Sequence, residues 1–66
     1  MPYINIKITD EKVSRADKLK LIQGATKLLQ DVLNKNPKTT FVIIEEVSTD
    51  NWGIGGQQVS TLRKLG

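Results

Sequence analysis

Residues 39–47 read TTFVIIEEV, and the centre of this stretch is apolar on both faces of an extended chain. The four residues FVII, at 41–44, follow one another without the polar alternation that a strand with one solvated face would show. We therefore predict a strand over about residues 39–47 that is covered from both sides.

A second strand is predicted at the start of the chain, over about residues 2–9. In YINIKI, residues 3–8, apolar and polar residues alternate, which is typical of a half-buried strand. One face carries Ile4, Ile6 and Ile8, and the other carries Tyr3, Asn5 and Lys7.

The segment between these strands has the pattern of one helix, over about residues 14–34. Ser14 followed by Asp17 resembles a capping box, and apolar residues then recur at steps of three and four. Pro37 restricts the residue before it away from helical angles, so the helix ends near Asn34. Gly24 lies inside the apolar stripe and predicts a close packing contact.

Strand, helix and strand together predict a single βαβ unit of the α+β class, with parallel strands and a right-handed crossover. One helix cannot cover both faces of a sheet, so the exposed face and the sheet edges imply that the fold is completed by homo-oligomerisation. After the second strand, glycines at 53, 55 and 56 predict a turn or short hairpin over about residues 50–62.

The composition narrows the chemistry of this single domain of 66 residues. Cysteine and histidine are both absent, which removes disulfides, the usual metal and haem ligands, and thiol or imidazole catalysis. We expect neither a metal nor another cofactor. No signal peptide or membrane span is visible, so a cytoplasmic protein without a membrane partner is the default expectation.

The formal charge of +3 favours anionic partners in general. The basic residues never form a run longer than two, and the chain has only three aromatic residues that can stack on bases. A nucleic-acid-binding module is thus a weak third hypothesis, and we expect a small acidic molecule as the partner.

Read together, the two ends of the chain resemble the 4-oxalocrotonate tautomerase family of the tautomerase superfamily. The resemblance covers nearly the whole chain. It is carried by Met1-Pro2 leading directly into a strand, by the βαβ unit, and by the strand end EEV that precedes WGIGG at residues 52–56.

This resemblance implies that Met1 is removed and that the nitrogen of Pro2 is the catalytic base. An α-amino group titrates near ~7.7–8.0, and desolvation or nearby cations lower the pKa of such an amine toward neutrality. A base of that kind takes a proton from one atom and returns it to another. Without the resemblance, Pro2 is an ordinary first residue of an edge strand.

The family also binds its substrate through arginines and an apolar wall. The first family arginine falls near Lys12, with Arg15 one step into the helix, and either cation is a candidate for the substrate carboxylate. The family's second arginine is missing from this chain, because Phe41 stands at the corresponding position. The resemblance implies that Trp52, Ile8 and Ile54 form the apolar wall, although each is equally compatible with a core position.

The function implied is that of a cofactor-independent enol–keto tautomerase. Its substrate would be a small 2-hydroxy-dienoate or 2-oxo acid such as 2-hydroxymuconate, as in aromatic compound degradation, bound between the subunits of a hexamer built as a trimer of dimers. The alternative is a non-catalytic self-assembling or small-molecule-binding paralogue of the same fold.

Overall fold

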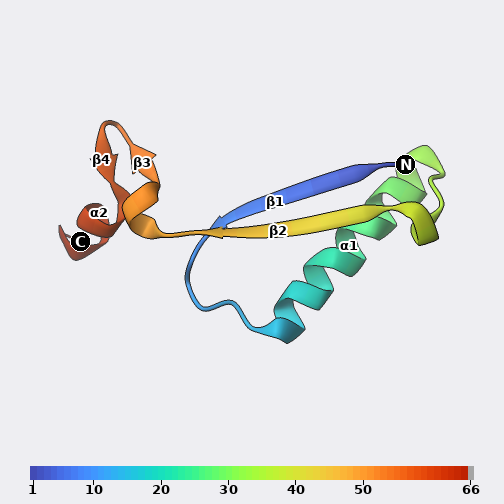
Figure 1. The fold of residues 1–66 in the computed structure, drawn as a ribbon, viewed down its shortest axis with the longest axis horizontal. Coiled ribbons are helices and arrows are strands. Elements are labelled where there is room, and N and C mark those ends of the chain that lie inside the picture. Colours follow the sequence, from blue (N-terminus) through green and yellow to red (C-terminus); the bar gives the residue numbers. More distant parts are fainter. Residues whose placement is uncertain (66) are drawn as a thin grey trace.

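The computed structural model describes residues 1–65, and its two main strands lie side by side along one helix (Figure 1). A small C-terminal unit of hairpin and helix lies at the opposite end of the molecule from the N-terminus. The elements are β1 (Tyr3–Thr9), α1 (Arg15–Leu33), β2 (Phe41–Val47), β3 (Gly53–Ile54), β4 (Gln57–Gln58) and α2 (Val59–Leu65), with 3₁₀ turns at Pro37–Thr39 and Thr49–Asn51.

Strands β1 and β2 pair in parallel over their whole length. The register runs from Tyr3 opposite Phe41 to Thr9 opposite Val47. The helix connects the two strands, as a parallel pair requires. The prediction of a βαβ unit with parallel strands is therefore confirmed.

Helix α1 covers only one face of this two-stranded sheet. Lys18 of α1 forms an ion pair with Glu46 of β2, which lies opposite Ile8 in the register. Because side chains alternate along a strand, the face next to α1 also carries Ile4 and Ile6. These isoleucines are half-buried.

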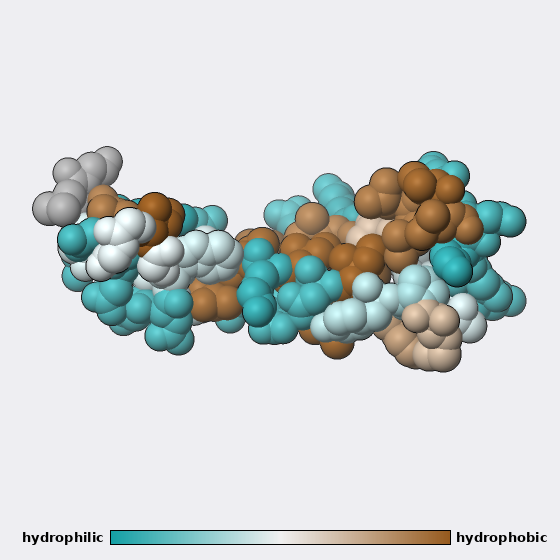
Figure 2. Space-filling model, turned by 90° about the horizontal axis from the view of Figure 1, so that it is seen from above, coloured by the Kyte–Doolittle hydropathy of each residue, from teal (hydrophilic) through white to brown (hydrophobic). Residues whose placement is uncertain are grey.

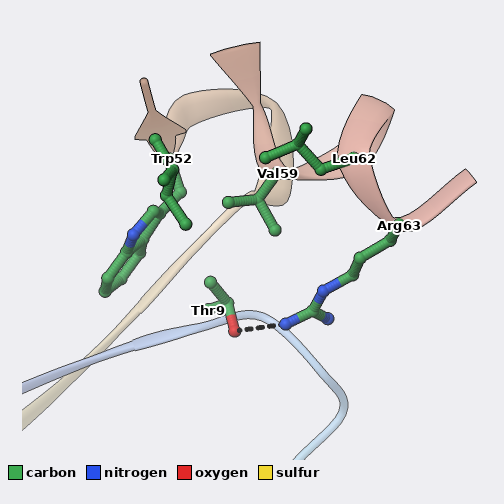
Figure 3. Close-up of a pocket in the computed structure, with 6 residues that line it drawn as sticks. Thr9, Trp52, Val59, Leu62 and Arg63 are labelled. Atoms are coloured by element: carbon green, nitrogen blue, oxygen red, sulfur yellow. Dashed lines mark hydrogen bonds between the residues drawn. The ribbon is translucent and has the colours of Figure 1, made fainter. Parts of the chain in front are cut away.

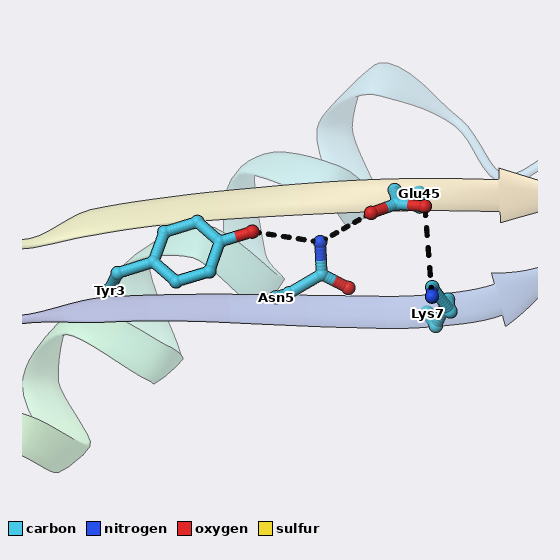
Figure 4. Close-up of polar contacts among 4 residues, drawn as sticks. All are labelled: Tyr3, Asn5, Lys7 and Glu45. Carbon is cyan, nitrogen blue, oxygen red and sulfur yellow. Dashed lines mark hydrogen bonds and ion pairs between the residues drawn. The ribbon is translucent and has the colours of Figure 1, made fainter.

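The other face of the sheet carries a row of polar contacts (Figure 4). The Nδ2 of Asn5 lies 2.7 Å from Oε1 of Glu45 and 3.1 Å from the hydroxyl oxygen of Tyr3. Lys7 lies 4.0 Å from the same carboxylate. The adjacent Glu45 and Glu46 thus point to opposite faces, as their positions on one strand predict.

The ends of α1 follow local backbone chemistry. Ser14 caps the helix, and its hydroxyl accepts a hydrogen bond from the amide of Asp17 at 3.1 Å. At the other end Asn34 adopts the left-handed conformation, with φ of 55°, that commonly ends a helix. The close contact predicted at Gly24 is wrong within this chain, because a Cβ added there would meet no atom within 4 Å.

The C-terminal unit differs from the turn or hairpin expected over residues 50–62. Gly55 and Gly56 have φ values of 59° and 81°, which suits the two-residue turn joining β3 to β4. From Val59 onward the chain forms helix α2, which the sequence pattern did not predict.

The molecule is extended and exposes much of its apolar surface. Its radius of gyration is 15.1 Å, whereas a compact chain of this length would have about 11 Å. Among the residues whose burial is described, Val59 is the one buried hydrophobic side chain, at 6% exposure. Figure 2 shows apolar surface along the middle of the molecule and toward the N-terminal end. On the sheet face away from α1, Phe41 and Ile43 are about half exposed.

Candidate active site

Two of the predicted site residues, Trp52 and Ile54, line one cavity of about 510 Å³ (Figure 3). The cavity lies where the end of β1 meets the C-terminal unit. Its lining is completed by Thr9, Val59, Leu62 and Arg63. It therefore combines an apolar wall with one hydroxyl and one cation.

Local hydrogen bonds place Trp52 against α2. The carbonyl of Trp52 accepts a hydrogen bond from the amide of Val59 at 2.8 Å, and the Nε2 of Gln58 donates to the carbonyl of Asp50 at 3.0 Å. These bonds hold the hairpin and the start of α2 to the turn that follows β2. The indole is half-buried as a result.

The polar side of the cavity is built around Arg63. Its guanidinium forms an ion pair with Glu11 and approaches the hydroxyl of Thr9 with an N–O distance of 3.5 Å. Hydrogen bonds from Arg63 and from Thr9, with the positive charge of Arg63, lower the pKa of the Glu11 carboxyl below its ordinary value. Glu11 therefore stays ionised beside Arg63 at neutral pH.

Pro2 lies at the other end of β1 from this cavity (Figure 1). Strand β1 runs for seven residues from Tyr3 to Thr9, which lines the cavity, and a rise of about 3.3 Å per residue makes that span roughly 20 Å. The carbonyl of Pro2 accepts a hydrogen bond from the amide of Phe41 at 3.0 Å. This bond holds Pro2 at the start of the parallel pair.

The other candidate residues do not line the cavity of Trp52. Lys12 has a positive φ of 59°, and its amide lies 3.4 Å from the carboxylate of Asp10. Arg15 lines a different cavity, along the first turns of α1. Ile8 lies on the sheet face that α1 covers, whereas its neighbour Thr9 contributes to the cavity.

The candidate residues drawn from the sequence did not include Thr9, Val59, Leu62 or Arg63. A signal for three of them was present, because Val59, Leu62 and Arg63 are spaced three and four residues apart and so share one face of a helix. The pairing of Arg63 with Glu11 has no such signal, since the two residues are far apart in the sequence.

Residues 1–65 hold no group of three or more acidic side chains placed to bind a metal ion. Nor does any helix within these residues have the length and hydropathy needed to cross a membrane.

Comparison with known proteins identifies the family. Residues 2–62 match the family model described as "Tautomerase enzyme". A protein of Dickeya dadantii (strain 3937), "Probable tautomerase K2", is 56% identical over 64 residues, covering 97% of this chain and 96% of its own.

Solved structures agree with this match. DmpI from Helicobacter pylori superposes with a TM-score of 0.88 at 42% identity, covering 96% of this chain and 97% of its own. A 4-oxalocrotonate tautomerase isozyme from Methylibium petroleiphilum gives a TM-score of 0.85 at 26% identity, with 92% and 97% covered. The chain therefore belongs to the tautomerase family of isomerases, as a member of the 4-oxalocrotonate tautomerase type.

Proposed function

We propose that this chain is a cofactor-independent enol–keto tautomerase whose general base is the nitrogen of Pro2, exposed by removal of Met1. The substrate is a small 2-hydroxy-dienoate or 2-oxo acid, with 2-hydroxymuconate as the first compound to test. This proposal adds the base and the substrate class to the family assignment. A cytoplasmic location and a role in aromatic compound degradation are parts of the same proposal.

The observation that carries the proposal is the position of Pro2. Its carbonyl is held by the amide of Phe41, so its nitrogen is kept at one defined end of the sheet. Met1 is 82% exposed, so its removal costs little packing. The freed secondary amine has a lone pair, whereas the amide that exists while Met1 is attached has no basic nitrogen.

A prolyl amine in this position performs the reaction by moving one proton. It takes the proton of the substrate's enol hydroxyl, while the electron pair of that bond moves through the conjugated system toward carbon. The protonated amine then delivers a proton to the carbon, which leaves a ketone and restores the base. Bonds and charges balance without any cofactor.

The substrate site of this proposal lies between chains. Pro2 and the cavity of Trp52 are roughly 20 Å apart along β1, which is more than a six-carbon diacid can span. A substrate that touches both must therefore take Pro2 from one copy and the indole from another. The exposed Phe41 and Ile43 supply an apolar surface for such assembly, for which we propose a hexamer arranged as a trimer of dimers.

The decisive experiment measures the rate of 2-hydroxymuconate ketonisation by protein shown by intact mass to lack Met1. Pro2→Ala is expected to lower kcat about 10²- to 10⁴-fold, because general base catalysis contributes about that much. Pro37→Ala is the matched control, since Pro37 is the chain's other proline and lies in the 3₁₀ turn before β2.

Equal rates for the Pro2 and Pro37 variants would contradict Pro2 as the base. Rates at background for Met1-free parent protein would remove this substrate from the proposal. Retention of Met1 by the native protein would favour the non-catalytic paralogue, because an amide nitrogen cannot accept the proton.

A further inference from the structure

We propose that Arg63 binds the carboxylate of the substrate in the cavity of Trp52, and that Glu11 occupies Arg63 when no acidic ligand is present. This inference rests on the proposed function, which supplies the ligand: an acid with a short carbon chain. It assigns a cation to the carboxylate of that ligand.

The composition of the cavity supports this assignment. Trp52, Ile54, Val59 and Leu62 give it an apolar wall, and Arg63 is the one cation among its lining residues. Ligand cavities typically pair a mostly apolar lining with a few polar groups that orient the ligand. An apolar wall with a single guanidinium matches a hydrocarbon chain that ends in a carboxylate.

Glu11 shows that the guanidinium is accessible to a carboxylate in this geometry. The Glu11 and Arg63 side chains are each about half exposed, so neither is enclosed by the protein. Thr9 lies beside both and orients the guanidinium through the 3.5 Å contact with its hydroxyl oxygen. A substrate carboxylate that displaces Glu11 would therefore find the same guanidinium already positioned.

The chemistry of arginine makes it better suited to this task than the earlier candidates. A guanidinium presents two parallel N–H groups to a carboxylate, whereas the ammonium of Lys12 is a point charge. Arg15 has the same chemistry but lines a cavity on α1 that does not include Trp52. Arg63 has a guanidinium and also lines the cavity of Trp52.

Binding of adipate tests the proposal without requiring catalysis. Adipate is a saturated six-carbon diacid with no enol, and Trp52, the only tryptophan of the chain, reports binding by its fluorescence. Arg63→Ala is expected to weaken adipate binding at least about ten-fold, because it removes charge-assisted hydrogen bonds. Arg63→Lys should retain an intermediate affinity.

Lys64→Ala is the matched control, since it removes the same charge from the next residue of α2. It is expected to bind adipate within about two-fold of the parent. Glu11→Gln is expected to bind adipate several-fold more tightly, because it removes the carboxylate that competes for Arg63.

Arg63→Ala also leaves Glu11 without its partner, so a folding defect must be separated from a lost ligand contact. The double variant Glu11→Gln/Arg63→Gln removes both charges and leaves no unpaired group. Circular dichroism and the measured oligomeric state show whether each variant keeps the parent structure. Weak adipate binding by a folded double variant supports the proposal.

Three results would overturn the proposal. They are parent-like adipate affinity in folded Arg63→Ala or in the double variant, an equal loss in Lys64→Ala, and weaker binding in Glu11→Gln. Failure of the proposed function gives a different pattern. In that case adipate binding still depends on Arg63, while ketonisation of 2-hydroxymuconate is absent or independent of Pro2.

Discussion

The carboxylate of Glu11, in the loop after β1, forms an ion pair with the guanidinium of Arg63 in α2. This pair joins the loop after β1 to α2. Arg63 also lines the cavity of Trp52, so the pair places an acidic side chain next to the cation of that cavity.

Acidification should remove the stabilising effect of the Glu11–Arg63 pair. The pKa of Glu11 is lowered in the folded chain, so its contribution is complete above the unfolded value of about 4.3 and is lost as pH falls through the lower folded value. Thermal unfolding should therefore show the parent more stable than Glu11→Gln at pH 6, with the two curves converging in acid. Parallel curves down to pH 3 would contradict this.

Loss of the helix cap should destabilise α1. Ser14→Ala removes the hydroxyl that accepts the Asp17 amide, at an expected cost of about 1 kcal/mol in the free energy of unfolding. Urea unfolding measures this cost. Ser14→Asp is the rescue control, because its carboxylate accepts the same hydrogen bond and also suits the positive end of the helix dipole. A fully stable Ser14→Ala would show that the cap is dispensable.

Replacement of Gly24 should stabilise the chain. Gly24→Ala gains up to about 1 kcal/mol of helix propensity, and the added Cβ meets no atom of this chain within 4 Å. Gly55→Ala is the contrasting control, since a φ of 59° at this turn position penalises an alanine by roughly 1 kcal/mol. A loss of stability in Gly24→Ala, measured by urea unfolding, would place a partner chain against this part of α1.

A charge on the open face of the sheet should weaken self-association. Ile43 is 48% exposed beside the polar row of Asn5 and Glu45, and Ile43→Glu would put an unpaired carboxylate into any interface formed there. Light scattering after size exclusion should show a smaller species at equal protein concentration. Gln30→Glu, an exposed and already polar position on α1, is the control. Unchanged mass for Ile43→Glu would exclude this face as an interface.

Several local features were predictable because neighbouring residues cause them. The alternation in β1, the cap at Ser14 and the opposite directions of Glu45 and Glu46 each depend on residues a few positions apart. The C-terminal helix was missed because the glycines before it favoured a turn. The apolar spacing from Val59 covers barely two turns of helix, which is too short for a firm periodic signal.

The candidate site was predictable in part. The resemblance led to Trp52 and Ile54, and the structure places both on one cavity. The resemblance points to Lys12 and Arg15 only through their position along the chain, and that position does not determine where a side chain lies. Arg63 was overlooked because its partner Glu11 belongs to a distant segment.

The sequence by itself determined the order of β1, α1 and β2, because that order follows from local hydrophobic patterns. Its two ends also carried the resemblance to the family that the comparisons confirm. Only the tertiary structure decided that Pro2 and the cavity of Trp52 lie at opposite ends of β1, and that Arg63 forms an ion pair with Glu11. The physical reason is that periodicity specifies which face a residue takes within its own element. The distance between elements depends on strand length, register and the path of the loops, which only the folded chain defines.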